Sequence, residues 1–145
     1  MNTPESYLPA ESIAVIGMRG RFPGAQDLER QIRDQSPAGA VEFIRRTGLS
    51  GPMVNHYDWG GYLMWALPEQ KVFIDNRGDV FDWAGVLAEY GRWVTVKEDP
   101  KILLEKYGVQ YCLLPTTAPM AFVLPHMPGW KQVYSDKVSI IFARE

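Results

Sequence analysis

A helix pattern passes directly into a strand pattern in the run Lys101-Ile-Leu-Leu-Glu-Lys-Tyr-Gly-Val-Gln-Tyr-Cys-Leu-Leu114. Asp99-Pro100 precedes this run and Gly108 interrupts it. We therefore expect a helix over 101–107, with an Asp cap at its start and a glycine at its end. Residues 110–114 are mostly apolar and match a buried strand. A helix that leads at once into a buried strand is typical of α/β proteins.

The same alternation of helix and strand patterns extends over most of the chain. The sequence predicts helices over 37–47, 60–67 and 82–95, a helical turn over 118–124, strands over 13–16, 53–55 and 71–75, and a closing hairpin over 130–136 and 138–144. We therefore expect an α/β fold, in which a mixed, mainly parallel sheet is flanked by helices and ends in a C-terminal β-hairpin.

The composition excludes several classes of protein. The 145 residues are 46% hydrophobic and 22% charged with a formal net charge of −2, which gives no electrostatic footprint for nucleic acid. No stretch approaches the ~18 apolar residues of a membrane span, and the N-terminus lacks the basic region of a signal peptide. The single cysteine, Cys112, cannot form an internal disulfide and is expected in the core. We expect a soluble chain without a cofactor, whose compartment stays open.

A glycine-rich loop, Gly17-Met-Arg-Gly-Arg-Phe-Pro-Gly24, follows the predicted strand 13–16. A dinucleotide-binding fingerprint needs G-x-G-x-x-G running straight into a helix, whereas these glycines fall at i, i+3 and i+7. Pro23 also removes one backbone N–H donor from the loop. We interpret the loop as a structural turn, with phosphate binding as the less favoured alternative.

Residues 12–25 resemble the start of the ketosynthase domain of modular polyketide synthases. The family's active-site cysteine and two histidines lie far downstream, and neither Cys112 nor a histidine of this chain stands in their contexts. The resemblance therefore implies a structural arm over 1–36 without condensation activity. Because the strand 13–16 is apolar, we expect it to add to an edge of the main sheet or to a partner chain, as in a homodimer.

Polar and aromatic residues gather where two predicted strands end. The first strand leads into Asn55-His-Tyr-Asp-Trp-Gly-Gly-Tyr62, and the second is contained in Val72-Phe-Ile-Asp-Asn-Arg77. Ligands of open α/β sheets bind at the carboxyl ends of the strands. If the two strands are neighbours, four side chains converge at this edge of the sheet: His56, Asp58, Asp75 and Arg77.

The chemistry of this cluster is open between binding and structure. Asp58 is expected to cap the N–H groups of Gly60 or Gly61, and the two glycines allow a neighbouring element or a ligand to approach closely. The carboxylates suit a cation, and Arg77 suits an anion. An Asp cap and a buried Asp–Arg pair are common structural devices, and this interpretation of the cluster is favoured over ligand binding. We expect no metal, because three candidate ligands at unrecognised spacing do not make a known site.

The aromatic residues also divide into candidates for ligand binding and candidates for a structural role. Trp59 and Trp83 flank the cluster and are expected to be exposed to a ligand, whereas Trp65 and Trp93 lie in helical patterns and are expected in the core. The apolar stretch 120–127 matches a packed element, and a lipid-facing patch of a parent membrane protein is the alternative.

Four landmarks along 37–145 resemble the C-terminal soluble domain of bacterial multi-spanning glycosyltransferases that use lipid-phosphate sugars. They are Tyr57-Asp-Trp-Gly-Gly-Tyr-Leu63, Ile74-Asp-Asn-Arg77, Leu103-Leu-Glu-Lys-Tyr-Gly-Val109 and Trp130-Lys-Gln-Val-Tyr-Ser-Asp136. The first is also distantly similar to the Trp-Trp-Asp-Tyr-Gly motif of oligosaccharyltransferase catalytic subunits, although His56-Tyr57 replaces the paired tryptophans. In both families the catalytic carboxylates belong to membrane-embedded segments or their loops.

The resemblance implies a non-catalytic accessory domain, extracytoplasmic in its parent, that presents an acceptor or lipid-linked sugar to a separate active site. Six residues are its candidate contacts: His56, Tyr57, Asp58, Trp59, Asp75 and Arg77. The alternative is a structural or interaction module of fused or recombined origin, with no ligand. A component of a polyketide pathway is the least favoured reading. Since the chain shows no complete catalytic set, we do not expect an enzyme.

Overall fold

The computed structural model of the protein describes residues 34–77 and 84–145. The chain separates into two units, Met1–Ser36 and Pro37–Glu145. The helices and strands given below all belong to the second unit. The predicted strand 13–16 and the glycine-rich loop after it lie outside the described residues, so the predicted arm and its pairing stay predictions.

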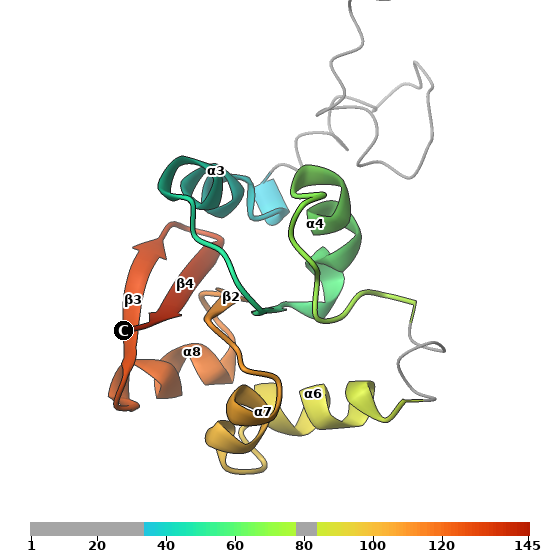
Figure 1. Ribbon diagram of the computed structural model, residues 1–145, viewed down its shortest axis with the longest axis vertical. Helices are drawn as coiled ribbons and strands as arrows, with labels where there is room; N and C mark the ends of the chain where they lie inside the picture. The colour runs from blue at the N-terminus through green and yellow to red at the C-terminus, as the bar shows by residue number, and fades with distance from the viewer. Residues whose placement is uncertain (1–33, 78–83) are drawn as a thin grey trace, which may run out of the picture. The chain divides into compact units, whose positions relative to one another are not determined.

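Four strands form one mixed sheet in the described part of the chain (Figure 1). In spatial order they are β1 (Met53–Asn55), β2 (Tyr111–Pro115), β4 (Ser139–Arg144) and β3 (Trp130–Ser135). β1 runs parallel to β2, whereas β2 pairs with β4, and β4 with β3, in antiparallel orientation. The last two strands are the predicted C-terminal hairpin.

The α/β class is confirmed, but the prediction of a mainly parallel sheet is wrong. Only one of the three strand pairs in the described residues is parallel. Residues 71–75, which would have supplied a further strand, have no strand conformation. The short connection between β3 and β4 can join only antiparallel strands, because a parallel pair needs a long crossover.

Helices cover both faces of the sheet (Figure 1). Their bounds are α3 (Ala38–Thr47), α4 (Gly60–Ala66), α6 (Val86–Val94), α7 (Pro100–Lys106), α8 (Pro119–Val123), and the 3₁₀ turns η2 (Tyr57–Trp59) and η3 (Leu124–His126). In β2, Tyr111 and Leu113 pack with α3 and α4, while Cys112 and Leu114 pack with α6, α7 and α8. Burial on both faces explains why this strand is a continuous apolar run.

The helix ends follow their local chemistry. The Asp99 carboxylate accepts a hydrogen bond from the Lys101 N–H at 3.0 Å, which confirms the predicted cap of α7. Gly48 ends α3 in the left-handed region, at φ 69°. After α6, however, Val96 occupies that region at φ 57°, and its N–H donates to the Trp93 carbonyl at 3.0 Å. A β-branched residue is strained in this conformation.

Candidate functional site

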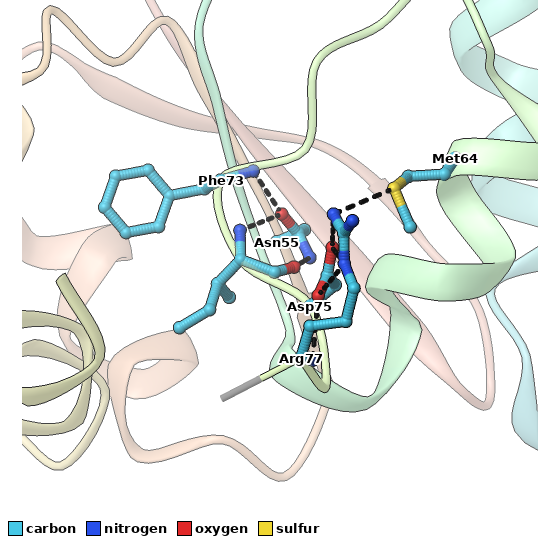
Figure 2. Close-up of polar contacts among 6 residues, drawn as sticks. Asn55, Met64, Phe73, Asp75 and Arg77 are labelled. Atoms are coloured by element: carbon cyan, nitrogen blue, oxygen red, sulfur yellow. Dashed lines mark hydrogen bonds and ion pairs between the residues drawn. The ribbon is translucent and has the colours of Figure 1, made fainter. Parts of the chain in front are cut away.

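The side chain of Asn55, the last residue of β1, holds the segment that carries half of the candidate site (Figure 2). Its Oδ1 accepts hydrogen bonds from the N–H of Phe73 at 2.7 Å and of Ile74 at 3.3 Å. Its Nδ2 donates to the Ile74 carbonyl at 2.8 Å and to the His56 carbonyl at 2.9 Å. Asn55 and Ile74 are both fully buried, so the two hydrogen bonds between them form out of contact with water.

This arrangement explains why the prediction of a strand over 71–75 is wrong. The segment lies beside the end of β1, but an asparagine side chain bonds the backbone groups of Phe73 and Ile74. The apolar run Val72-Phe-Ile74 still enters the core, with Ile74 fully buried and Phe73 packed edge-on against Tyr107 at 5.0 Å between ring centroids. Buried polar backbone groups need partners, whether or not a ladder supplies them.

Asp75 and Arg77 form an ion pair held by four hydrogen bonds directly after this segment (Figure 2). The Asp75 Oδ2 accepts from Arg77 Nη2 at 2.6 Å and from Nε at 3.0 Å, and the Asp75 Oδ1 accepts from the Arg77 backbone N–H at 2.8 Å. The carboxylate is fully buried, whereas the Arg77 side chain is 62% exposed. The hydrogen bonds from Arg77 lower the pKa of Asp75 against the opposing effect of burial. The pair therefore fixes a cationic group at the surface.

Helix α4 packs directly on this pair. A Cβ atom at Gly60, the first residue of α4, would overlap the Ile74 carbonyl and the Asp75 backbone, whereas one at Gly61 would meet nothing within 4 Å. The predicted close approach is thus confirmed at Gly60, and the group that approaches it is the protein backbone at Ile74 and Asp75. From the next turn of α4, the Met64 sulfur accepts a hydrogen bond from Arg77 Nη2 at 3.8 Å (Figure 2).

His56 and Asp58 form the second pair of the site. Their Nε2 and Oδ2 atoms lie 3.4 Å apart, the Asp58 side chain is 75% exposed, and the His56 side chain is 28% exposed. The His56 Nδ1 is buried, and none of the described residues supplies it with a hydrogen-bond partner. Burial lowers the pKa of His56, and the Asp58 carboxylate partly opposes this effect.

The predicted cap of α4 by Asp58 is wrong. Trp59 occupies the N-cap position, and its side chain makes no capping hydrogen bond. The reason is the 3₁₀ turn η2, in which the Gly60 N–H donates to the Tyr57 carbonyl. The helix start therefore continues an existing turn, and the Asp58 carboxylate is directed to His56 instead.

The two aromatic candidates belong to the core side of the site. Trp59 is only 7% exposed and packs edge-on against His56, with 5.1 Å between ring centroids, so the prediction that it is exposed to a ligand is wrong. Trp59 ends the 3₁₀ turn η2 and packs in the core cluster that also holds Leu63 and Ala66 of α4. The Tyr57 N–H donates to the Tyr90 hydroxyl on α6 at 3.1 Å, which ties η2 to the opposite helix layer. Trp83 lies outside the described residues.

The structure thus brings the candidates together as two pairs, joined through one residue that the sequence reading missed. The Asn55 Nδ2 bonds both the His56 carbonyl and the Ile74 carbonyl, so it links the His56–Asp58 pair to the Asp75–Arg77 pair. The sequence signal that could have identified Asn55 is a polar asparagine at the end of an apolar strand. Tyr90 and Met64 were also missed, because they come from helices whose positions only the tertiary fold reveals.

A metal centre finds no support in the described ranges. They contain no group of three or more His, Cys, Asp and Glu residues placed to hold an ion. Cys112 is fully buried in β2, as predicted, and burial raises the pKa of its thiol. Across 34–77 and 84–145, none of the helices is long and apolar enough to cross a membrane.

Comparison with protein-family models, with curated proteins and with solved structures finds no match for this chain. The resemblances to glycosyltransferase and ketosynthase segments are therefore neither supported nor opposed by these comparisons. The geometry of the site is the basis for a functional proposal.

Proposed function

We propose that the unit Pro37–Glu145 is a non-catalytic recognition domain that binds a phosphate-bearing ligand at Arg77, such as a lipid-phosphate sugar or a modified acceptor. The observation that carries this proposal is the pairing of an exposed guanidinium with a fully buried carboxylate. Because Nε and Nη2 bond Asp75, the planar guanidinium directs Nη1 away from the carboxylate. An oriented arginine loses little side-chain entropy on binding.

Phosphate is the ligand group that this geometry fits best. A guanidinium donates in a fixed plane that matches phosphate oxygens, and this match is closer than for an ammonium group. The Asp58 carboxylate, 75% exposed beside His56, is an acceptor suited to sugar hydroxyls. Since the Asp75 carboxylate offsets much of the positive charge of Arg77, we expect modest affinity for the ligand. Binding should therefore require both the phosphate group and the sugar hydroxyls.

The sharpest test substitutes Arg77 without removing its charge. Arg77→Lys keeps a cation beside the buried Asp75 but loses the planar fork, so we expect at least a tenfold loss of affinity for a short-chain isoprenyl-phosphate sugar. Arg92→Lys is the matched control, because Arg92 is also exposed and pairs with Glu98 at 3.1 Å. Calorimetric titration of the full chain should separate the two variants. Equal binding by both would remove Arg77 from the site.

A structural module without a ligand is the second candidate, and one observation favours it. Among the described residues, the Asp75 carboxylate receives four hydrogen bonds and all four come from Arg77, so the pair can be satisfied internally. In this alternative the pair only fixes the chain after Ile74. Arg77→Lys would then change only the free energy of unfolding. In the same calorimetric series, neither the native chain nor the variants would bind the phosphate sugar.

A further inference from the structure

The Met64 side chain of α4 is a sulfur contact of Arg77 that the proposed function does not use. Arg77 Nη2, which bonds the Asp75 carboxylate at 2.6 Å, also donates to the Met64 sulfur at 3.8 Å (Figure 2). Leu63 and Ala66 of α4 are buried in the core and fix the helix that carries Met64. The Met64 backbone is therefore held within reach of the guanidinium.

Met64 is also the most exposed methionine in the described ranges. It is 39% exposed, whereas Met53 and Met120 are 3% and 0% exposed. Met127 is half-buried and packs against the core. Oxidants in solution reach an exposed thioether more readily than a buried one. Of these four methionines, Met64 is therefore the one that we expect to be oxidised first.

A peroxide oxidises a methionine at its sulfur. A sulfur lone pair attacks one oxygen of hydrogen peroxide, and the O–O bond breaks. The released hydroxide takes the proton of the transferred oxygen and leaves as water, so the sulfur loses two electrons and the peroxide gains them. The product is a sulfoxide, which is polar where the thioether was apolar. Cys112 does not compete, because burial raises the pKa of its thiol and the reactive form is the thiolate.

A sulfoxide oxygen is a better partner for the Arg77 guanidinium than the thioether sulfur. A thioether accepts hydrogen bonds only weakly, whereas a polar oxygen that accepts from a charged donor forms one of the stronger kinds of hydrogen bond. Arg77 Nη2 already faces the sulfur, and the Arg77 side chain is 62% exposed. Rotation of the flexible Met64 side chain is enough to bring the oxygen to the guanidinium, without movement of the buried Asp75.

We propose that Met64 is an oxidation site, at which a peroxide forms a sulfoxide that binds the Arg77 guanidinium. The consequence for ligand binding rests on the proposed function, because the sulfoxide oxygen competes with a phosphate for the donors of Arg77. Oxidation therefore weakens binding of the phosphate sugar. A methionine sulfoxide reductase supplied with a dithiol reverses the change, since the dithiol becomes a disulfide and the oxygen leaves as water.

Peroxide treatment of the full chain tests the site without any ligand. We expect mass spectrometry to find Met64 oxidised at least about tenfold faster than Met53 and Met120, as their difference in exposure requires. NMR should show a shift of the Arg77 Nε–H resonance when Met64 is oxidised. Met127→Leu is the matched control and should keep this shift, whereas Met64→Leu should lose it.

Calorimetric titration with the short-chain isoprenyl-phosphate sugar measures the effect on binding. We expect peroxide to weaken binding by at least about fivefold in the native chain and in Met127→Leu, because both keep the Met64 sulfur. Met64→Leu should keep the affinity that it has before treatment. This variant also controls for oxidation of Met1 and Met18, which lie outside the described residues. Reductase and dithiol should restore the native affinity, which damage to the fold would prevent.

Three results would overturn the proposal. One is oxidation of Met64 no faster than that of the buried methionines, and another is an Arg77 Nε–H resonance that does not move when Met64 is oxidised. The third is an oxidised native chain that binds the phosphate sugar as tightly as the untreated chain. If the untreated chain does not bind the phosphate sugar, the proposed function fails, whereas a shifted Arg77 resonance would still support the contact between sulfoxide and guanidinium.

Discussion

Asn55 and Ile74 exchange hydrogen bonds in both directions across 19 positions of sequence, from Asn55 Nδ2 to the Ile74 carbonyl at 2.8 Å and from the Ile74 N–H to Asn55 Oδ1 at 3.3 Å. A side-chain amide carries the same donor and acceptor as a peptide group, so Asn55 replaces a strand partner. The segment before Asp75 is thereby fixed at the end of β1. The candidate site depends on this one side chain.

Asn55→Ala should lower the free energy of unfolding by roughly 2–4 kcal/mol, because it leaves the buried backbone groups of Ile74 and the partly buried N–H of Phe73 without partners. Urea-induced unfolding measures the loss. Gln70→Ala is a suitable control, since the Gln70 side chain donates to the Gly51 carbonyl at 2.8 Å but is only half-buried. A loss at Asn55 no greater than at Gln70 would show that the amide is dispensable.

Adjacent glycines of α4 should respond in opposite directions to alanine. Gly60→Ala places a methyl group against the Ile74 carbonyl and the Asp75 backbone, and we expect a loss of about 2 kcal/mol. Gly61→Ala meets nothing within 4 Å and should add about 0.5–1 kcal/mol through better helix propensity. Thermal unfolding of both variants gives the comparison. Similar effects at the two positions would mean that α4 does not pack on Asp75 as described.

Val96→Gly should stabilise the protein by up to about 1 kcal/mol, because glycine adopts the left-handed conformation at φ 57° without strain. The reciprocal variant is Gly108→Ala, at φ 58° with nothing within 4 Å of the new methyl group. It should cost about 1 kcal/mol for the same conformational reason. Denaturant unfolding would refute the interpretation if Val96→Gly proved neutral or destabilising.

The Asp75–Arg77 pair should make stability depend on pH in the acid range. The pKa of Asp75 is lower in the folded chain than its ordinary value of 3.8, so the unfolded state binds a proton first as the pH falls. The stabilisation is complete above the unfolded value and is lost as the pH falls through the folded value. Asp75→Asn should therefore lose less stability than the native chain between about pH 5 and pH 2.5. Parallel curves for the two proteins would contradict this assignment.

The helices and the final hairpin could be predicted from the sequence because their signals are local. The Asp99 cap, the glycine after α3 and the apolar run of β2 each depend on a few adjacent residues. Whether neighbouring strands pair in parallel or antiparallel orientation was harder to predict from the sequence. The run Val72-Phe-Ile74 is equally apolar whether a strand or an asparagine side chain bonds its backbone, so its pattern could not reveal which partner it has.

The candidate site was predictable only in part for a related reason. Asp75 and Arg77 are two positions apart in the sequence, so their pairing could be predicted from the local pattern alone. The role of Asp58 depended on how the chain enters α4, and a 3₁₀ turn cannot be distinguished from a capped start by residue type. The burial of Trp59 and the contact of Tyr57 with Tyr90 arise from packing between distant elements.

Residue-resolved NMR of the full chain during titration tests the central claim most directly. The panel comprises a short-chain isoprenyl-phosphate sugar, a short acceptor peptide, Mg²⁺ and Ca²⁺. The account predicts saturable shifts for the phosphate sugar, concentrated at His56–Asp58 and Asp75–Arg77, with no saturable response to either cation. A well-dispersed spectrum that stays unchanged at millimolar phosphate sugar would contradict the account and leave these pairs with a purely structural role.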